Sequence, residues 1–144
     1  MRSYNFSMGK VLEYREGLEK DYIEKFASKQ NLYFSKQKEL EKLLDEYRQI
    51  KKKTGSYKSI DDMLREQLYR QNLADKIEKE EYYLEELSKD LEIARGQLVN
   101  AQKDRKIMEK LKEKDYDKFQ SKLKAIEQKD LDEVNTLKFA RKDL

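Results

Sequence analysis

The sequence predicts an all-α protein in which two long helices form an antiparallel coiled-coil hairpin, the second helix being longer and projecting beyond the first. Three observations support this fold. The chain of 144 residues contains no Pro and only four Gly, so it has few places at which to reverse direction. Its apolar share of 37% is below the roughly 45–50% of an ordinary globular domain, so a large compact core is not expected. Finally, apolar residues recur every three or four positions through most of the chain.

Disorder is the alternative for a chain in which 44% of residues are charged and the mean hydropathy is −1.15. Disordered chains are poor in aromatic residues and lack periodicity, whereas this one has ten Tyr and five Phe at helical intervals. The 33 basic and 30 acidic residues nearly balance, so self-repulsion is weak. We therefore expect ordered helices in a single hairpin domain spanning residues 1–144.

The first helix is expected at about residues 6–53. Residues spaced by three or four positions define one seam along it, and nine of the twelve are apolar. The basic interruptions can lie along the seam by their apolar stems while the charge reaches water. The seam comprises Val11, Arg15, Leu18, Tyr22, Phe26, Lys29, Tyr33, Lys36, Leu40, Leu43, Tyr47 and Ile50.

A turn is expected at residues 54–59. Three lysines at 51–53 suit the negative end of a helix dipole, and Gly55 can take the left-handed conformation of a C-terminal cap. Ser59, followed by Asp62 three residues later, resembles the N-terminal cap of a new helix. Such a short connection favours two antiparallel helices.

The second helix is expected at about residues 60–141, and its seam has thirteen apolar residues among sixteen. Residues 1–53 carry a net charge of +4 and residues 54–100 a net charge of −4, which favours pairing of these two segments; residues 101–144 carry +3. The seam comprises Leu73, Ile77, Glu80, Leu84, Leu87, Leu91, Ala94, Leu98, Ala101, Arg105, Met108, Lys112, Tyr116, Phe119, Leu123 and Ile126.

The two helices differ in length, and this difference predicts a binding surface. At a rise of ~1.5 Å per residue, the first helix spans about 72 Å and the second about 120 Å. The first helix would then cover the second only to about residue 107. The apolar residues beyond that point would lack an intramolecular partner, and such a stripe is normally a binding surface. They are Met108, Tyr116, Phe119, Leu123, Ile126, Val134 and Leu137.

The composition excludes most enzymes. The chain has no Cys and no His, so it lacks thiolate nucleophiles, disulfides, the commonest general base and the commonest transition-metal ligands. Gly9–Lys10 lacks the earlier glycine and the following Ser or Thr of a phosphate-binding loop. We expect a protein that is not an enzyme and that uses no cofactor or metal.

The same features bear on localisation and on partners. No apolar run approaches the roughly 20 residues of a membrane span, and residues 1–25 contain no signal-peptide core, so a cytoplasmic protein is expected. Acidic residues are mixed with basic ones along the helices, which argues against nucleic acid and against a membrane-surface helix. Tyr22 and Tyr33 suit the seam, whereas Tyr57 and Tyr69 near the turn are candidate anchors for a protein partner.

Several stretches resemble the flagellar FliJ family. The opening at residues 4–16, Tyr-Asn-Phe-Ser-Met-Gly-Lys-Val-Leu-Glu-Tyr-Arg-Glu, is similar to the family's start. Residues 46–48 (Glu-Tyr-Arg), the basic stretch 103–114, Phe119, and residues 131–133 (Leu-Asp-Glu) follow in the family's order. The resemblance covers essentially the whole chain. The stalk proteins of virulence type III secretion are a close second.

The resemblance implies a component of the flagellar protein-export apparatus that lies at the inner face of the cell membrane only through its partners. Its open end would enter the ring of the export ATPase. The end near the turn would contact the cytoplasmic part of the export gate and handle export chaperones. The alternatives are the stalk of a virulence system, a structural rod that dimerises through its C-terminal seam, and an adaptor unrelated to secretion. For a stalk we expect a monomer.

Two sets of residues follow by position as candidate partner-binding sites. The tip patch, which would face the export gate, comprises Leu40, Leu43, Tyr47, Tyr69 and Leu73. The open-end patch, which would face the ATPase ring, comprises Val11, Arg15, Arg105, Met108, Tyr116, Phe119 and Leu123.

Overall fold

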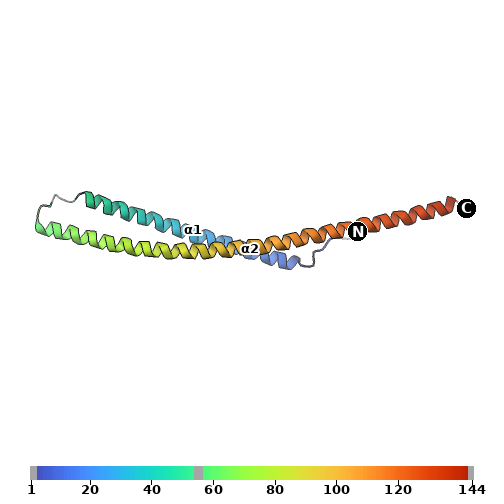
Figure 1. Ribbon diagram of the computed structural model, residues 1–144, viewed down its shortest axis with the longest axis horizontal. Coiled ribbons are helices and arrows are strands. Elements are labelled where there is room, and N and C mark those ends of the chain that lie inside the picture. Colours follow the sequence, from blue (N-terminus) through green and yellow to red (C-terminus); the bar gives the residue numbers. More distant parts are fainter. Residues whose placement is uncertain (1–2, 54–56, 143–144) are drawn as a thin grey trace. The chain divides into compact units, whose positions relative to one another are not determined.

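A computed structural model describes residues 3–53 and 57–142 of the chain, and these residues form two α-helices (Figure 1). Helix α1 is Gly9–Lys52, with 44 residues, and helix α2 is Ile60–Lys142, with 83 residues. The helices pack against each other, and the second is the longer. The all-α fold expected from the sequence is therefore confirmed.

Helix α1 begins three residues later than expected. Tyr4 and Phe6 precede the helix and are half-buried, and the first backbone hydrogen bond runs from the Gly9 amide to the Phe6 carbonyl, at 3.1 Å. The first turn of α1 contains no acidic residue that could interact with the positive end of the helix dipole. Residues 3–6 have no regular secondary structure and residues 7–8 form a turn; we call residues 3–8 the N-terminal strap.

The start of α2 agrees with the expected cap. The Ser59 hydroxyl accepts a hydrogen bond from the Asp62 amide at 3.2 Å, and the Met63 amide donates to the Ser59 carbonyl at 3.2 Å. Asp61 and Asp62 lie in the first turn, where their charge favours the positive end of the helix dipole. The cap expected at Gly55 lies outside the described residues.

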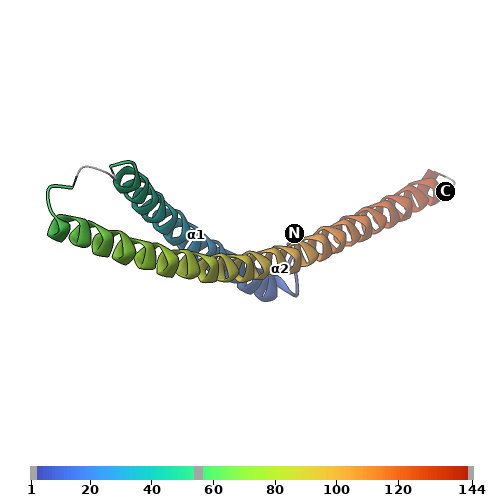
Figure 2. The ribbon, with the colours of Figure 1, turned by 60° about the vertical axis from the view of Figure 1, so that its left-hand side comes forward.

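The contacts divide the chain into two units, each containing a piece of both helices. The first unit contains residues 3–19 and 101–142, and the second contains residues 20–100. In the second unit, Lys25 contacts Gln97 and Tyr69 donates to Glu46, so the two helices run antiparallel. The end of α1 and the start of α2 lie at the same end of this unit in both views (Figures 1 and 2). A single domain over 1–144 stays a prediction.

The buried residues follow the seams expected from the sequence. Eight of the nine buried apolar residues among those described lie at expected seam positions. The second unit contains the cluster Leu40, Leu73 and Ile77, against which partly buried apolar residues pack. These partly buried residues are Leu43, Leu44, Tyr47, Ile50 and Leu84. Leu87, Leu91 and Ala94 continue the buried seam along α2.

The exception is at the start of α1. The sequence placed Val11 on the seam, but Val11 is 37% exposed, whereas Leu12 is only 6% exposed. Both positions fit the seam arithmetic, since a residue three or four positions before Arg15 lies on the same helix face. The larger Leu side chain occupies the buried position.

Two glycines lie inside the helices, Gly17 in α1 and Gly96 in α2. A Cβ atom added at either position would meet no atom within 4 Å. Neither glycine therefore marks a close approach between helices.

Candidate partner-binding surfaces

The residues expected in the tip patch have different roles in the second unit. Leu40 and Leu73 are 8% and 6% exposed and belong to the core, so their side chains support the surface from below. Leu43 and Tyr47 are half-buried against that core. Tyr69 is 49% exposed, so it is the tip-patch residue most available to a partner.

The position of Tyr69 is set by a carboxylate of the other helix. Its hydroxyl donates a hydrogen bond to Glu46 of α1. This hydrogen bond raises the pKa of Tyr69, and partial burial and the negative charge of Glu46 act in the same direction. A surface groove of about 240 Å³ lies beside the ring and is lined by Leu43, Glu46, Tyr69, Asn72, Leu73 and Lys76.

A second apolar surface near the turn was not expected from the sequence. Ile60, Leu64 and Leu68 are 77%, 57% and 60% exposed. Their spacing of four residues puts them on one face of α2, which we call the outer stripe, and this face differs from that of Leu73 and Ile77. The spacing of these residues in the sequence could have revealed this surface, because three aliphatic residues at i, i+4 and i+8 lie on one face of a helix.

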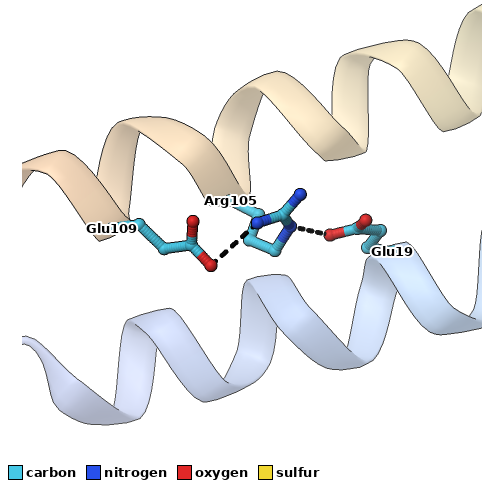
Figure 3. Close-up of polar contacts among 3 residues, drawn as sticks. All are labelled: Glu19, Arg105 and Glu109. Atoms are coloured by element: carbon cyan, nitrogen blue, oxygen red, sulfur yellow. Dashed lines mark hydrogen bonds and ion pairs between the residues drawn. The ribbon is translucent and has the colours of Figure 1, made fainter.

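In the first unit, an ion-pair network joins the two helices (Figure 3). The Arg105 guanidinium of α2 donates to Glu19 of α1 through Nε and to Glu109 of α2 through Nη1, the latter at 2.7 Å. The Arg105 and Glu19 side chains are only 23% and 13% exposed. The hydrogen bonds to Glu109 and then to Glu19 raise the pKa of Arg105, so the guanidinium stays charged.

A neighbouring pair also crosses between the helices. Arg15 of α1 donates to Asp104 of α2 at 3.0 Å, with the two side chains 38% and 47% exposed. The two arginines of the open-end patch thus lie on the seam with their charged ends paired to carboxylates. Arg15 is paired with Asp104, and Arg105 is paired with both Glu19 and Glu109.

The N-terminal strap covers part of the seam that the sequence left unpaired. The Tyr4 hydroxyl donates to an Asp115 carboxylate oxygen at 3.0 Å and to the Lys112 carbonyl at 3.3 Å. The Tyr4 ring lies edge-on to Tyr116, with centroids 5.0 Å apart, and 5.3 Å from the Phe119 ring. Partial burial and the hydrogen bond to Asp115 raise the pKa of Tyr4.

The seam was expected to be unpaired from Met108 onward, and this expectation is wrong. Met108 is 7% exposed, and the strap contacts α2 as far as Phe119. The expected limit at residue 107 counted only the length of the first helix, whereas Tyr4, which precedes α1, contacts Tyr116 and Phe119. The strap therefore covers α2 beyond the point that α1 alone reaches.

The unpaired segment begins near residue 124. Leu123 is half-buried, and every described residue from 124 to 142 is exposed. We call residues 124–142 the exposed tail. Its large apolar side chains are Ile126, Leu131, Val134, Leu137 and Phe139. Of the open-end patch, Met108 is buried, whereas Val11 and Tyr116, at 37% and 42% exposed, are partly accessible.

Within residues 3–53 and 57–142, no group of three or more acidic residues is arranged to hold a metal ion. Neither helix, over its described length, has a segment apolar enough to span a bilayer.

The fold and these surfaces define a class of protein: a two-helix hairpin whose apolar residues are exposed near the turn and along the end of the longer helix. A family model described as Flagellar FliJ protein matches residues 4–144, so the chain belongs to the FliJ family. Membership makes it a non-catalytic component of the flagellar export apparatus, and confirms the resemblance seen in the sequence. No curated protein and no solved structure matches the chain.

Proposed function

We propose that this chain is the stalk of the flagellar export apparatus, which engages the export ATPase ring and promotes its activity. The observation that carries this proposal is the exposed tail, where α2 continues for 19 residues with every side chain exposed. An apolar stripe of this length on a single helix, without a partner in the chain, is suited to insertion into a protein lumen.

The charges of the exposed tail suit a contact that can be exchanged. Between residues 124 and 142 there are five basic and four acidic residues, so the tail is almost neutral. Mixed-sign surface pairs are worth only about 0–1 kcal/mol each. Such contacts would hold the tail in a ring while permitting it to move or rebind.

The second unit would provide the link to the export gate. Tyr69 and the groove beside it, together with the outer stripe, present exposed aromatic and aliphatic groups near the turn. Leu40 and Leu73 contribute by holding the helices together beneath this surface. Export chaperones are the third class of partner in this proposal, and the chain itself would act as a monomer in the cytoplasm at the inner face of the membrane.

The test is removal of the exposed tail from the full chain by truncation after Leu123. The truncated protein keeps the strap contacts and the core, so it should retain its helical fold and lose most stimulation of the export ATPase. Substitution of Leu131, Val134 and Leu137 by Ser should have the same effect. The control is substitution of Ile107 and Leu111 by Ser, which should leave stimulation intact. These two residues are 57% and 45% exposed but lie off the seam. Full stimulation by the truncated protein would contradict the proposal.

The same exposed tail supports one competing function, a structural rod that dimerises through this segment. Sedimentation velocity at micromolar concentration separates the two, because a rod should form a tight dimer that the truncation abolishes. A stalk should sediment as a monomer with or without the tail.

A further inference from the structure

A group of basic residues lies where α1 ends and α2 begins. Between residues 47 and 60 there are five basic residues and no acidic residue, whereas the rest of the chain has 28 basic and 30 acidic residues, a net charge of −2. We call the five residues the basic tip. They are Arg48, Lys51, Lys52, Lys53 and Lys58.

Acidic residues on both sides cancel part of this charge. Asp61 and Asp62 lie in the first turn of α2, where they face the positive end of the helix dipole. Asp45 pairs with Arg48 at 3.7 Å, and residues 45–62, with five basic and four acidic residues, have a net charge of +1. The basic residues that an anionic surface would meet at this end are Lys52, Lys53 and Lys58, which are exposed.

Large apolar side chains accompany the basic tip. Ile60, the first residue of α2, is 77% exposed, and Met63 and Leu64 are 49% and 57% exposed. Lys52, Lys53 and Lys58 are exposed as well. The end of α1 and the start of α2 lie at the same end of the second unit (Figures 1 and 2).

We propose that the basic tip binds directly to a lipid bilayer that contains anionic phospholipids. The basic side chains would lie among the headgroups, and Ile60 and Leu64 would enter the boundary between headgroups and acyl chains. Each Lys or Arg near an anionic membrane surface contributes about a fivefold increase in partitioning, and shallow apolar residues add to it. The mixed charges along the rest of the hairpin argue against a helix lying flat on the membrane, but they do not extend to the tip.

The chemistry of the tip favours lipid over nucleic acid. Phosphate tracking along a nucleic acid needs a positive stripe along a helix or groove, whereas this charge lies within a few residues of one helix end and one helix start. The most exposed apolar residue beside it is aliphatic Ile60, which cannot stack on a base but suits an acyl boundary. A fluid headgroup layer can also accept a protruding end without a complementary groove.

The experiment measures co-flotation of the full chain with vesicles of phosphatidylcholine, with and without phosphatidylglycerol. Binding should require the anionic lipid and should weaken at high salt. Substituting Gln for Lys52, Lys53 and Lys58 should lower partitioning by about 100-fold. Substituting Ser for Ile60 and Leu64 should lower it further. No variant should lose helicity, because all of these side chains are exposed.

The matched control is substitution of Gln for Lys122, Lys124 and Lys129, which removes the same charge from exposed positions of α2. This variant should bind vesicles like the parent protein. Equal loss by the control, failure of the parent protein to float with anionic vesicles, or tight binding to duplex DNA without vesicle binding would each overturn the proposal. The vesicles contain no export protein, so the outcome is independent of the stalk function proposed above.

Discussion

The two units of the hairpin hold their helices together by different means. In the second unit, Leu40, Leu73 and Ile77 form an apolar cluster, and the hydrogen bonds Lys25–Gln97 and Tyr69–Glu46 cross between the helices, whereas the ion pairs Glu86–Lys89 and Glu92–Arg95 each lie within one helix. In the first unit, Leu12, Ala101 and Met108 are buried, and ion pairs and aromatic contacts cross between α1, the strap and α2. The contacts are Arg15–Asp104, Glu19–Arg105 and the contacts of Tyr4 with Asp115, Tyr116 and Phe119.

This difference suggests which unit separates more readily. Burial of an aliphatic side chain contributes about 1.5–3 kcal/mol and does not depend on finding a specific partner atom. Partly exposed ion pairs contribute about 0–1 kcal/mol and can be replaced by equivalent groups of another protein. We therefore expect the cross-helix contacts of the first unit to be the more readily broken.

The largest expected effect comes from placing a charge in the apolar seam of the second unit. Leu87 is 8% exposed, so Leu87→Asp should bury an unpaired carboxylate and cost more than about 4 kcal/mol. The hairpin should lose most of its helicity in circular dichroism. Tyr82→Asp is the control, because Tyr82 is 67% exposed on the same helix. A fully helical Leu87→Asp protein would show that the seam is wrongly placed.

A smaller effect is expected when one buried leucine of each unit is replaced by alanine. Leu40 and Leu12 are 8% and 6% exposed, but Leu40 lies in the apolar cluster and Leu12 lies in the unit joined by polar pairs. Leu40→Ala should cost about 2–4 kcal/mol, and Leu12→Ala should lie at or below the lower limit of that range. Urea unfolding monitored by circular dichroism measures both. Equal losses would remove the distinction between the units.

The next largest effect is expected from breaking the ion-pair network of the first unit. Arg105→Gln removes the guanidinium that joins Glu19 to Glu109, so amide hydrogen exchange should accelerate around residues 15–19 and 101–109. Exchange around Leu40 and Leu73 should not change. High salt should reproduce part of the effect in the parent protein and little in the variant. Uniform acceleration throughout both helices would mean that the network supports the whole hairpin.

The smallest expected effect is a pH dependence of the strap. The pKa of Tyr4 is raised in the folded protein, so the folded state holds this proton more tightly than the unfolded state does. The stabilisation is therefore complete below the unfolded pKa near 10 and is lost as the pH rises through the higher folded value. Tyr4→Phe should abolish this part of the alkaline loosening, as measured by hydrogen exchange at residues 112–119. An unchanged alkaline profile in Tyr4→Phe would contradict it.

The sequence was sufficient for the helices, the cap at Ser59 and the seam of α2, because these depend on local chemistry and on helical periodicity. It placed Leu40 and Leu73 on the seams, where they are buried, but it also assigned them to the tip patch, since spacing gives the face of a residue but not its depth. It chose Val11 over Leu12, because both satisfy the same spacing. The strap was missed because a segment without regular secondary structure has no period, and its contacts with residues 112–119 depend on tertiary structure.

The residues of the outer stripe and the basic tip were visible in the sequence, but the sequence alone could not show that they form surfaces. Ile60, Leu64 and Leu68 were visible in the sequence, but they could be judged exposed only after the core of the second unit was known. The charge of residues 47–60 was visible too. Dividing the chain at residue 53, however, assigned these basic residues to two segments of opposite net charge.

Gly17 and Gly96 have a consequence for the stiffness of this protein. An alanine methyl would fit at either position without touching a neighbour, and it would remove up to ~1 kcal/mol of helix-destabilising freedom at each site. The packing therefore does not require glycine at either position, although glycine makes the helix backbone more flexible there. Their replacement would give a stiffer hairpin with every contact intact, a direct means of asking whether bending is part of the work this protein does.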